Sequence, residues 1–357
     1  MKPIATNQES NLFVQPYSSS FRGWVTKQSL IKNLITDQNN SQSFCYNWRF
    51  AYDYNLRGKK YGISLPYKRT KILKHKRFYL SISTKEKKGN MLVGLASTKQ
   101  TKIGSFYFLS HYCHPEQVND SLSGAAVFGC VMEKLLKTRN LKYQYIHLLC
   151  PETIGSVFYL SKLPKADKDK IIGAIFSDSI GWGKDWCLKR SRTECTLMDK
   201  IIDQLKIQNP RFKIKKFGDP YGNDELIFNS VQSDIPAISM YKYPFTEYHT
   251  NADRPEKIKH ENLQKAEKIL LEIVNILEKN KVYIFKHKTP FWMSRLNLFS
   301  DDQHEPDLFK LKFKIVYELI NGKNSILDIS NVLNVPFQKV KGFLDKMNIN
   351  NLLHEIK

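Results

Sequence analysis

The chain has 357 residues, carries a formal net charge of +22 at neutral pH and is 41% hydrophobic, which excludes a wholly disordered protein. Its apolar runs fall short of the roughly 18 residues that a membrane span requires, and the first residues lack the apolar stretch of a signal peptide. The six cysteines include no CxxC pair. We therefore expect a cytoplasmic protein without a membrane segment, in which the cysteines are free thiols.

The positive charge is concentrated towards the N-terminus. Residues 51–102 contain fourteen Lys or Arg and two acidic side chains, a net charge of +12. Residues 301–357 contain eight basic and eight acidic side chains. A basic surface favours acidic partners such as nucleic acid, an anionic glycan or an acidic substrate, although it can also serve solubility alone.

The first hundred residues are predicted to form a small basic module that is rich in β-structure. Aromatic and charged residues alternate between 44 and 100. Residues 77–83 indicate a strand, and residues 27–35 indicate a short helix. We take residues 1–100 as this module.

Residues 101–284 alternate strand-like apolar runs with amphipathic helical patterns, which predicts an α/β core with a mixed or mostly parallel sheet. The expected strands are 106–110, 145–150, 171–177 and 237–241. The expected helices are 124–137, 154–163, 191–208 and 261–279. The last helix shows the clearest period, with a continuous apolar face.

Residues 285–357 are predicted to contain a linker and then three short helices. The helical patterns cover 308–321, 326–333 and 336–348, a spacing that resembles a winged helix-turn-helix. A helix-turn-helix that binds DNA should be basic, but this region is neutral. We therefore expect it to pack or to contact protein, and we expect no nucleic-acid partner.

Histidines and a carboxylate gather where the first expected core strand ends. His111 and His114 follow the strand, and Asp120 precedes the next helix. The carboxyl ends of strands are where α/β proteins build their sites, and imidazole with carboxylate is a ligand set that suits zinc. The alternative is a capped loop with solvated histidines.

Four further stretches place polar residues after apolar runs. These residues are Glu152, Asp178, the pair Asp224 and Glu225, and the group Glu247, His249 and Asp253. Alone, each would be read as a surface or helix-capping residue. Together they supply what a hydrolytic zinc site needs, namely about three ligands, an open position for water and a carboxylate that accepts the proton of that water.

These motifs resemble those of the aminopeptidase-like zinc proteins of the DUF4910 group. That group is related to the M28 peptidases and more distantly to zinc carboxypeptidases. The motifs are S-H-Y-C-H-P, N-D-S-L-S-G, P-E-T-I-G-S, G-N-D-E and E-Y-H-T-x-x-D, in this order over about residues 100–280. The resemblance implies a phosphorylase/hydrolase-like α/β core with a mixed central sheet, a small extra domain before the first motif and a C-terminal winged helix.

The resemblance also implies a set of zinc ligands. Asp120 matches the metal-binding Asp of the M28 pattern, and His249 matches the last histidine ligand. His111 occupies the position of the first histidine ligand, but His114 could bind the metal instead. Asp178 lies near the position of a further ligand.

Other residues are implied to support the chemistry. Glu152 matches the general base, and Asp224 and Asp253 match carboxylates that orient ligands. Glu225 and Glu247 are candidates for holding the ammonium group of a substrate.

One departure from the M28 pattern concerns the number of metal ions. M28 peptidases carry two consecutive Glu residues at the base position, and the second binds metal. Here the pair is Glu152 and Thr153. Because threonine is a poor zinc ligand, we expect one zinc ion, with the second site weak or absent.

The function that these residues support is a zinc-dependent hydrolase of the aminopeptidase type that cleaves a peptide or a small amide. The alternative is a catalytically altered protein on a peptidase fold, which acts as a binding or regulatory module. The substrate is not specified by the sequence, and a homo-oligomer is left open.

Overall fold

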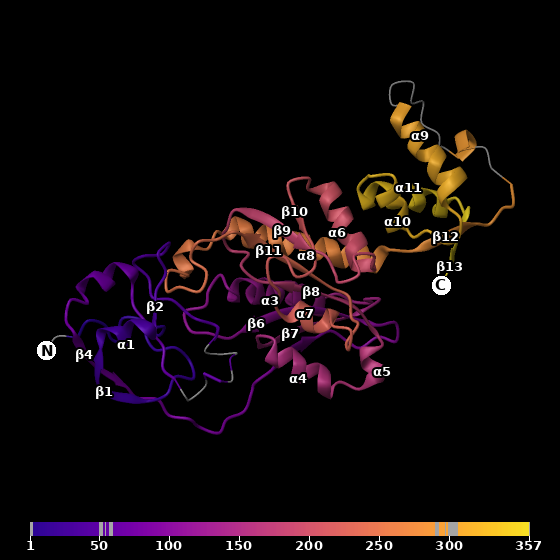
Figure 1. The fold of residues 1–357 in the computed structure, drawn as a ribbon. Helices are drawn as coiled ribbons and strands as arrows, with labels where there is room; N and C mark the ends of the chain where they lie inside the picture. The colour runs from indigo at the N-terminus through magenta and orange to yellow at the C-terminus, as the bar shows by residue number, and fades with distance from the viewer. Residues whose placement is uncertain are drawn as a thin grey trace.

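The protein is described here from a computed structural model, which covers residues 3–49, 53, 55–56, 60–289, 293–296, 298 and 306–356. The N-terminal module lies at one end of the molecule, the α/β core lies in the middle and the C-terminal helices lie at the other end (Figure 1). Among the described residues no helix is both long and apolar enough to cross a membrane.

A seven-stranded sheet organises the core, with the strand order β10-β9-β11-β8-β6-β7-β5. The strands are β5 (Gly94–Ser97), β6 (Ser105–Tyr112), β7 (Gln144–Pro151), β8 (Ile171–Ser177), β9 (Asp185–Lys189), β10 (Lys213–Lys215) and β11 (Ala237–Tyr243). The four central strands β11, β8, β6 and β7 are parallel, whereas β5 pairs antiparallel with β7, and β9 pairs antiparallel with β11 and parallel with β10. The mixed central sheet that the sequence predicts is therefore confirmed.

Helices cover both faces of this sheet. The helices α3 (Leu122–Leu136), α6 (Leu197–Gln208) and α8 (His260–Lys279) share one hydrophobic cluster, and α4 (Ile154–Lys162) and α7 (Asp224–Asn229) contribute to another. Along β6, Phe106 and Phe108 belong to the first cluster, while Tyr107 and Leu109 belong to the second. Because both faces are buried, this strand is a continuous apolar run, as parallel strands usually are.

The N-terminal module consists of two small sheets and a core of its own. β1 (Phe21–Thr26) pairs antiparallel with β4 (Arg77–Ile82), and β2 (Leu34–Ile35) pairs parallel with β3 (Ile63–Ser64). The helix α1 (Lys27–Lys32) and the 3-10 helix η1 (Tyr67–Ile72) complete it. Val25, Leu30 and Phe78 are among the residues that fill the core of the module.

The C-terminal region packs on the core rather than standing apart from it. It contains α9 (Pro306–Lys314), a π-helix (Ile315–Leu319), α10 (Ile326–Val332) and α11 (Phe337–Ile349), while β12 (Val282–Phe285) pairs with β13 (Leu353–Ile356). Gln204 of α6 accepts a hydrogen bond from the backbone of Phe337 at 2.6 Å. Leu344, Met347 and Leu353 belong to the same hydrophobic cluster as α6 and α8. The winged-helix assignment stays a prediction.

Candidate metal centre

The predicted site residues converge at one edge of the central sheet. His111 lies in β6, Asp178 directly follows β8, Glu152 directly follows β7 and His249 lies in the loop after β11. These four strands are parallel, so their carboxyl ends meet at the same edge.

Asp120 lies at the centre of this group. Its Oδ1 atom is 3.6 Å from His111 Nε2, while its Oδ2 atom is 3.5 Å from His114 Nε2 and 3.3 Å from His249 Nε2. The Asp120 side chain is almost completely buried. The sequence left open whether His111 or His114 binds the metal. In the structure both contact Asp120, His111 through Oδ1 and His114 through Oδ2.

The loop that carries Asp120 is held by its own hydrogen bonds. Asp253 accepts hydrogen bonds from the backbone N–H groups of Asn119 and Asp120, at 2.7 and 3.1 Å. Ser121 Oγ donates to the carbonyl oxygen of His111 at 2.8 Å. Asp253 thus fixes the backbone at Asp120, and its predicted role in orienting a metal ligand stays a prediction.

Helix α3 begins unusually close to the end of β8, and Gly124 permits this approach. A Cβ atom at position 124 would lie 1.9 Å from the carbonyl oxygen of Ser177. Only glycine fits at this distance. The glycine of the N-D-S-L-S-G motif therefore brings Asp120 towards Asp178.

The described residues offer three groups of side chains with the spacing of metal ligands. They are His111, Asp120 and Asp178; His114, Asp120 and His249; and His111, Cys113 and Glu152. Within each group the ligand atoms lie within 4.8 Å of one another. The first two groups share Asp120, which is an arrangement that two neighbouring ions could use.

The buried polar atoms of the site fit a bound cation. Both ring nitrogens of His111 and the Oδ2 atom of Asp224 are buried without a hydrogen-bond partner among the described residues. Buried polar atoms without a hydrogen-bond partner are rare in folded proteins, so a bound ion is expected to contact these atoms. His111 Nδ1 lies 3.5 Å from Asp224 Oδ2, so Asp224 contacts the imidazole of a candidate ligand.

The pKa values of the buried groups also indicate that a cation binds at this site. Burial raises the pKa of Asp178 to about 8, and the negative charge of Asp120 adds to this effect. Burial by itself lowers the pKa of His111, but the adjacent carboxylates of Asp120 and Asp224 raise it well above its ordinary value overall. Clustered buried carboxylates are costly unless positive charge compensates them, and a divalent cation on imidazole and carboxylate ligands would do so. The donor set suits zinc.

Glu152 lies next to the ligand groups with its carboxylate held in place. The side-chain amide of Asn223 donates to Glu152 Oε1 at 2.6 Å in the orientation that satisfies both groups. The following residue, Thr153, has a φ of 54° and donates its backbone N–H to Asp224 Oδ1 at 3.0 Å. Glu152 is therefore positioned by neighbours from the loop around residue 223.

The two carboxylates that were expected to hold a substrate ammonium group are paired within the chain. Glu225 is fully buried, and its Oε1 atom accepts a hydrogen bond from Lys189 Nζ at 2.7 Å. Glu247 accepts a hydrogen bond from Trp182 Nε1 at 3.0 Å and forms an ion pair with Lys257. The charge of each carboxylate is therefore compensated within the chain, and a role in substrate binding stays a prediction for both.

Tyr46 is a site residue that the sequence analysis missed. It comes from the N-terminal module, and its ring stacks on His114 with centroids 4.4 Å apart and meets His249 edge-on at 5.0 Å. Its backbone N–H donates to the carbonyl oxygen of His249 at 2.7 Å. No motif surrounds Tyr46 that could have identified it. The contacts of Cys113 and Asn223 with Glu152 were also not predicted, although Cys113 lies in the S-H-Y-C-H-P motif and Asn223 in the G-N-D-E motif.

Other contacts of the N-terminal module hold the loop that carries His249. Phe44 donates its backbone N–H to Asn251 Oδ1 at 3.1 Å, and Cys45 forms a β-bridge with Thr250. His249 itself has a φ of 57°, a left-handed conformation that is costly for a residue with a side chain. The module thus supports the strained residue that presents the imidazole.

Comparisons with known proteins agree with this architecture. A protein from Clostridium acetobutylicum is 25% identical over 348 residues, which cover 95% of this chain and 78% of the relative. Its provisional name combines polysaccharide biosynthesis with an aminopeptidase-like domain. A crystal structure from Clostridium acetobutylicum, provisionally named as a peptidase, has a TM-score of 0.81 at 24% identity and covers 99% of this chain and 80% of that one.

A more distant likeness extends to a zinc aminopeptidase from Bacillus subtilis. That structure has a TM-score of 0.53 at 17% identity, over 68% of this chain and 63% of that one. The likeness shows a common fold. The DUF4910 family, a domain of unknown function, matches residues 25–280. Because this match spans well over half of the sequence, the chain belongs to the DUF4910 family, and its core has the aminopeptidase-like fold.

Proposed function

We propose that the protein is a zinc-dependent hydrolase of the aminopeptidase type, which cleaves a peptide or a small amide. The observation that carries this proposal is the position of Asp120, which lies between three imidazoles at the carboxyl edge of the sheet. Glu152 lies beside the same cluster. The zinc aminopeptidase from Bacillus subtilis, which shares the fold, supports the choice of metal and reaction.

The geometry favours two zinc ions over the single ion expected from Thr153. His111, Asp178 and one Asp120 oxygen would hold the first ion, and His114, His249 and the other Asp120 oxygen would hold the second. His114 would then supply the ligand that Thr153 cannot.

The chain supplies the proton transfer of the proposed reaction. Bound zinc would lower the pKa of a coordinated water molecule and polarise the scissile carbonyl. The carboxylate of Glu152 would accept the proton of the attacking water and return it to the departing nitrogen. Asn223, which donates to Glu152 Oε1, fixes the orientation of that carboxylate.

The test compares zinc content and amide hydrolysis in three proteins. The wild type should hold about two zinc ions per chain and hydrolyse aminoacyl amides. Asp120→Ala should lose both the zinc and the activity. Glu152→Gln should keep the zinc but lose activity by about 10²-fold or more, because only the base is removed.

Glu133→Gln is the matched control, because Glu133 is an exposed residue of α3 outside the site, and it should behave as the wild type. Retained activity in Glu152→Gln would remove Glu152 from its role. Zinc without any hydrolysis in the wild type would favour the alternative, a binding module on a peptidase fold. Absence of zinc from protein that was never exposed to a chelator would contradict the proposal as a whole.

A further inference from the structure

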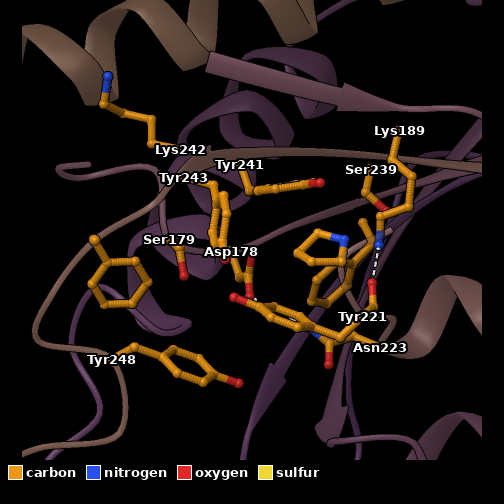
Figure 2. Close-up of a pocket in the computed structure, with 13 residues that line it drawn as sticks. Asp178, Ser179, Lys189, Tyr221, Asn223, Ser239, Tyr241, Lys242, Tyr243 and Tyr248 are labelled. Atoms are coloured by element: carbon orange, nitrogen blue, oxygen red, sulfur yellow. Dashed lines mark hydrogen bonds between the residues drawn. The ribbon is translucent and has the colours of Figure 1, made fainter. Parts of the chain in front are cut away.

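A pocket lies directly beside the candidate metal centre (Figure 2). Asp178, which lines it, belongs to one of the ligand groups. Tyr248, which also lines it, stacks on His249 with ring centroids 3.7 Å apart. A substrate that places its scissile carbonyl at the metal centre would therefore extend an adjacent substituent into this pocket.

Six of the thirteen residues that line the pocket are aromatic. They are Phe176, Tyr221, Tyr241, Tyr243, Phe245 and Tyr248. Tyr221 is stacked against Tyr248 at 5.8 Å and meets Tyr243 edge-on at 6.0 Å, so these rings support one another. Such walls accept the apolar stem of a side chain and give it a defined width.

Ser239 and Lys189 are two of the six polar side chains in the lining; the others are Asp178, Ser179, Asn223 and Lys242. Ser239 is 1% exposed, and its Oγ atom has no hydrogen-bond partner among the described residues. Lys189 is also buried, and its Nζ atom donates to the Tyr221 carbonyl oxygen at 2.6 Å and to Glu225 Oε1 at 2.7 Å. These bonds use two of the three protons of the ammonium group. Figure 2 shows Lys189 and Ser239 beside each other on the side of the view away from Tyr248.

The charges around the pocket select against an ionic occupant. The positive charge of Lys189 is paired with the buried carboxylate of Glu225, so this pair is neutral as a unit. Asp178 would be bound to the metal in the proposed function, and Lys242 Nζ lies 3.5 Å from the Lys184 carbonyl oxygen. An ionic side chain would therefore lose its hydration in the pocket without meeting an uncompensated opposite charge. A wholly apolar group would leave the Ser239 hydroxyl without a partner, which is costly for a buried group.

Resting on the proposed function, we infer that this pocket selects substrates whose side chain next to the scissile carbonyl is neutral and ends in a hydroxyl or carboxamide group. Ser239 and the remaining proton of Lys189 are the groups that recognise this end. Ser239 and Lys189 are thus specificity-determining residues of the site.

The test uses pairs of amino acid amides that have nearly the same shape. Threonine amide is compared with valine amide, and glutamine amide with methionine amide. Binding is measured by calorimetry on zinc-loaded Glu152→Gln protein, so hydrolysis is not required, and kcat/KM is measured on the wild type. The polar member of each pair should be favoured about tenfold or more, because the site is built to hydrogen-bond its side chain.

Ser239→Ala should reduce this preference by weakening only the polar member of each pair. Ser161→Ala, on the exposed surface of α4, is the matched control and should keep the preference. Thermal unfolding of Ser239→Ala verifies that the variant is folded. Three outcomes would overturn the inference. The apolar amides could bind as tightly as the polar amides or more tightly, neither class could bind, or the preference could be unchanged in Ser239→Ala. Selective binding of the polar amides without hydrolysis by the wild type would instead contradict the proposed function and leave the pocket assignment supported.

Discussion

At the scale of single residues, His114 is the side chain that sets this site apart from the M28 pattern. Thr153 occupies the position of an expected ligand, but its backbone N–H is bonded to Asp224. His114 lies 3.5 Å from Asp120 and stacks on Tyr46, so its ring is oriented towards the cluster. The consequence is an imidazole in place of a carboxylate on one side of Asp120.

His114→Ala should therefore lose one zinc ion and keep the other. We expect the metal content to fall from about two ions to about one per chain, and kcat/KM for an aminoacyl amide to fall about 10²-fold. Elemental analysis and kinetics measure the two effects. His260→Ala, at an exposed position of α8, is the matched control. An unchanged metal content in His114→Ala would assign the second site to other ligands.

The convergence of the candidate ligands could be predicted from the sequence because each of them lies in a short motif at the end of an apolar run; their role as ligands stays a prediction. Lys189 and Ser239 could not be predicted in the same way. Both lie inside strands, where a lysine or serine normally faces solvent, and only the arrangement of the sheet brings them into one pocket. Likewise Glu225 and Glu247 look like free acids in the sequence, and their lysine partners become visible only in three dimensions.

At the scale of elements, the start of α3 depends on one glycine. The helix approaches β8 so closely that a Cβ atom on Gly124 would overlap the Ser177 carbonyl oxygen. Gly129 lies in the same helix, but a Cβ atom there would meet nothing within 4 Å. Replacing Gly124 by alanine therefore tests the packing of α3 on β8, whereas replacing Gly129 tests helix propensity alone.

Gly124→Ala should destabilise the protein by about 2–3 kcal/mol, because the helix must move away from the strand. Gly129→Ala should be neutral or stabilising by up to about 1 kcal/mol, because alanine is the better helix former. Denaturant unfolding followed by circular dichroism measures both. Equal stability of the two variants would show that α3 can shift without cost.

The main elements of the core could be predicted because parallel strands and amphipathic helices have strong patterns. The strand expected over 171–177 coincides with β8, and the helix expected over 261–279 nearly coincides with α8. β5 and β10 are short edge strands, and β10 is flanked by lysines, so neither shows such a pattern. The helix expected from residue 191 begins only at Leu197, where the capping box of Thr196 and Asp199 starts it.

At the scale of the whole molecule, the N-terminal module contributes a side chain to the candidate metal centre. Tyr46 lies in a region that the sequence assigns to a separate module, yet its ring contacts two of the candidate ligands. Sequence patterns report local structure, so a contact between distant segments of this kind left no signal. The contact of Tyr46 with His114 and His249, rather than the basic charge of the module, links the module to the candidate ligands.

Tyr46→Ala should weaken zinc binding about tenfold, because His114 and His249 lose the ring that holds them. Tyr46→Phe keeps the ring and should bind zinc as the wild type does. Competition with a chelating dye measures the affinity, and Tyr67→Ala, at an exposed position of the module, is the control. Wild-type affinity in Tyr46→Ala would limit the module to a role outside the metal centre.

The contact between Tyr46 and His249 also has a consequence for the ancestry of the protein. A recombination event that joined residues 1–100 of one relative to the core of another would bring together a ring and a loop that had not been selected for each other. Such a chimera would fold each part and still misplace His249, because the hydrogen bond from Tyr46 and the bridge from Cys45 position that loop. The module and the core are therefore expected to descend as one inherited unit, with changes at position 46 accompanied by changes in the loop around residue 249.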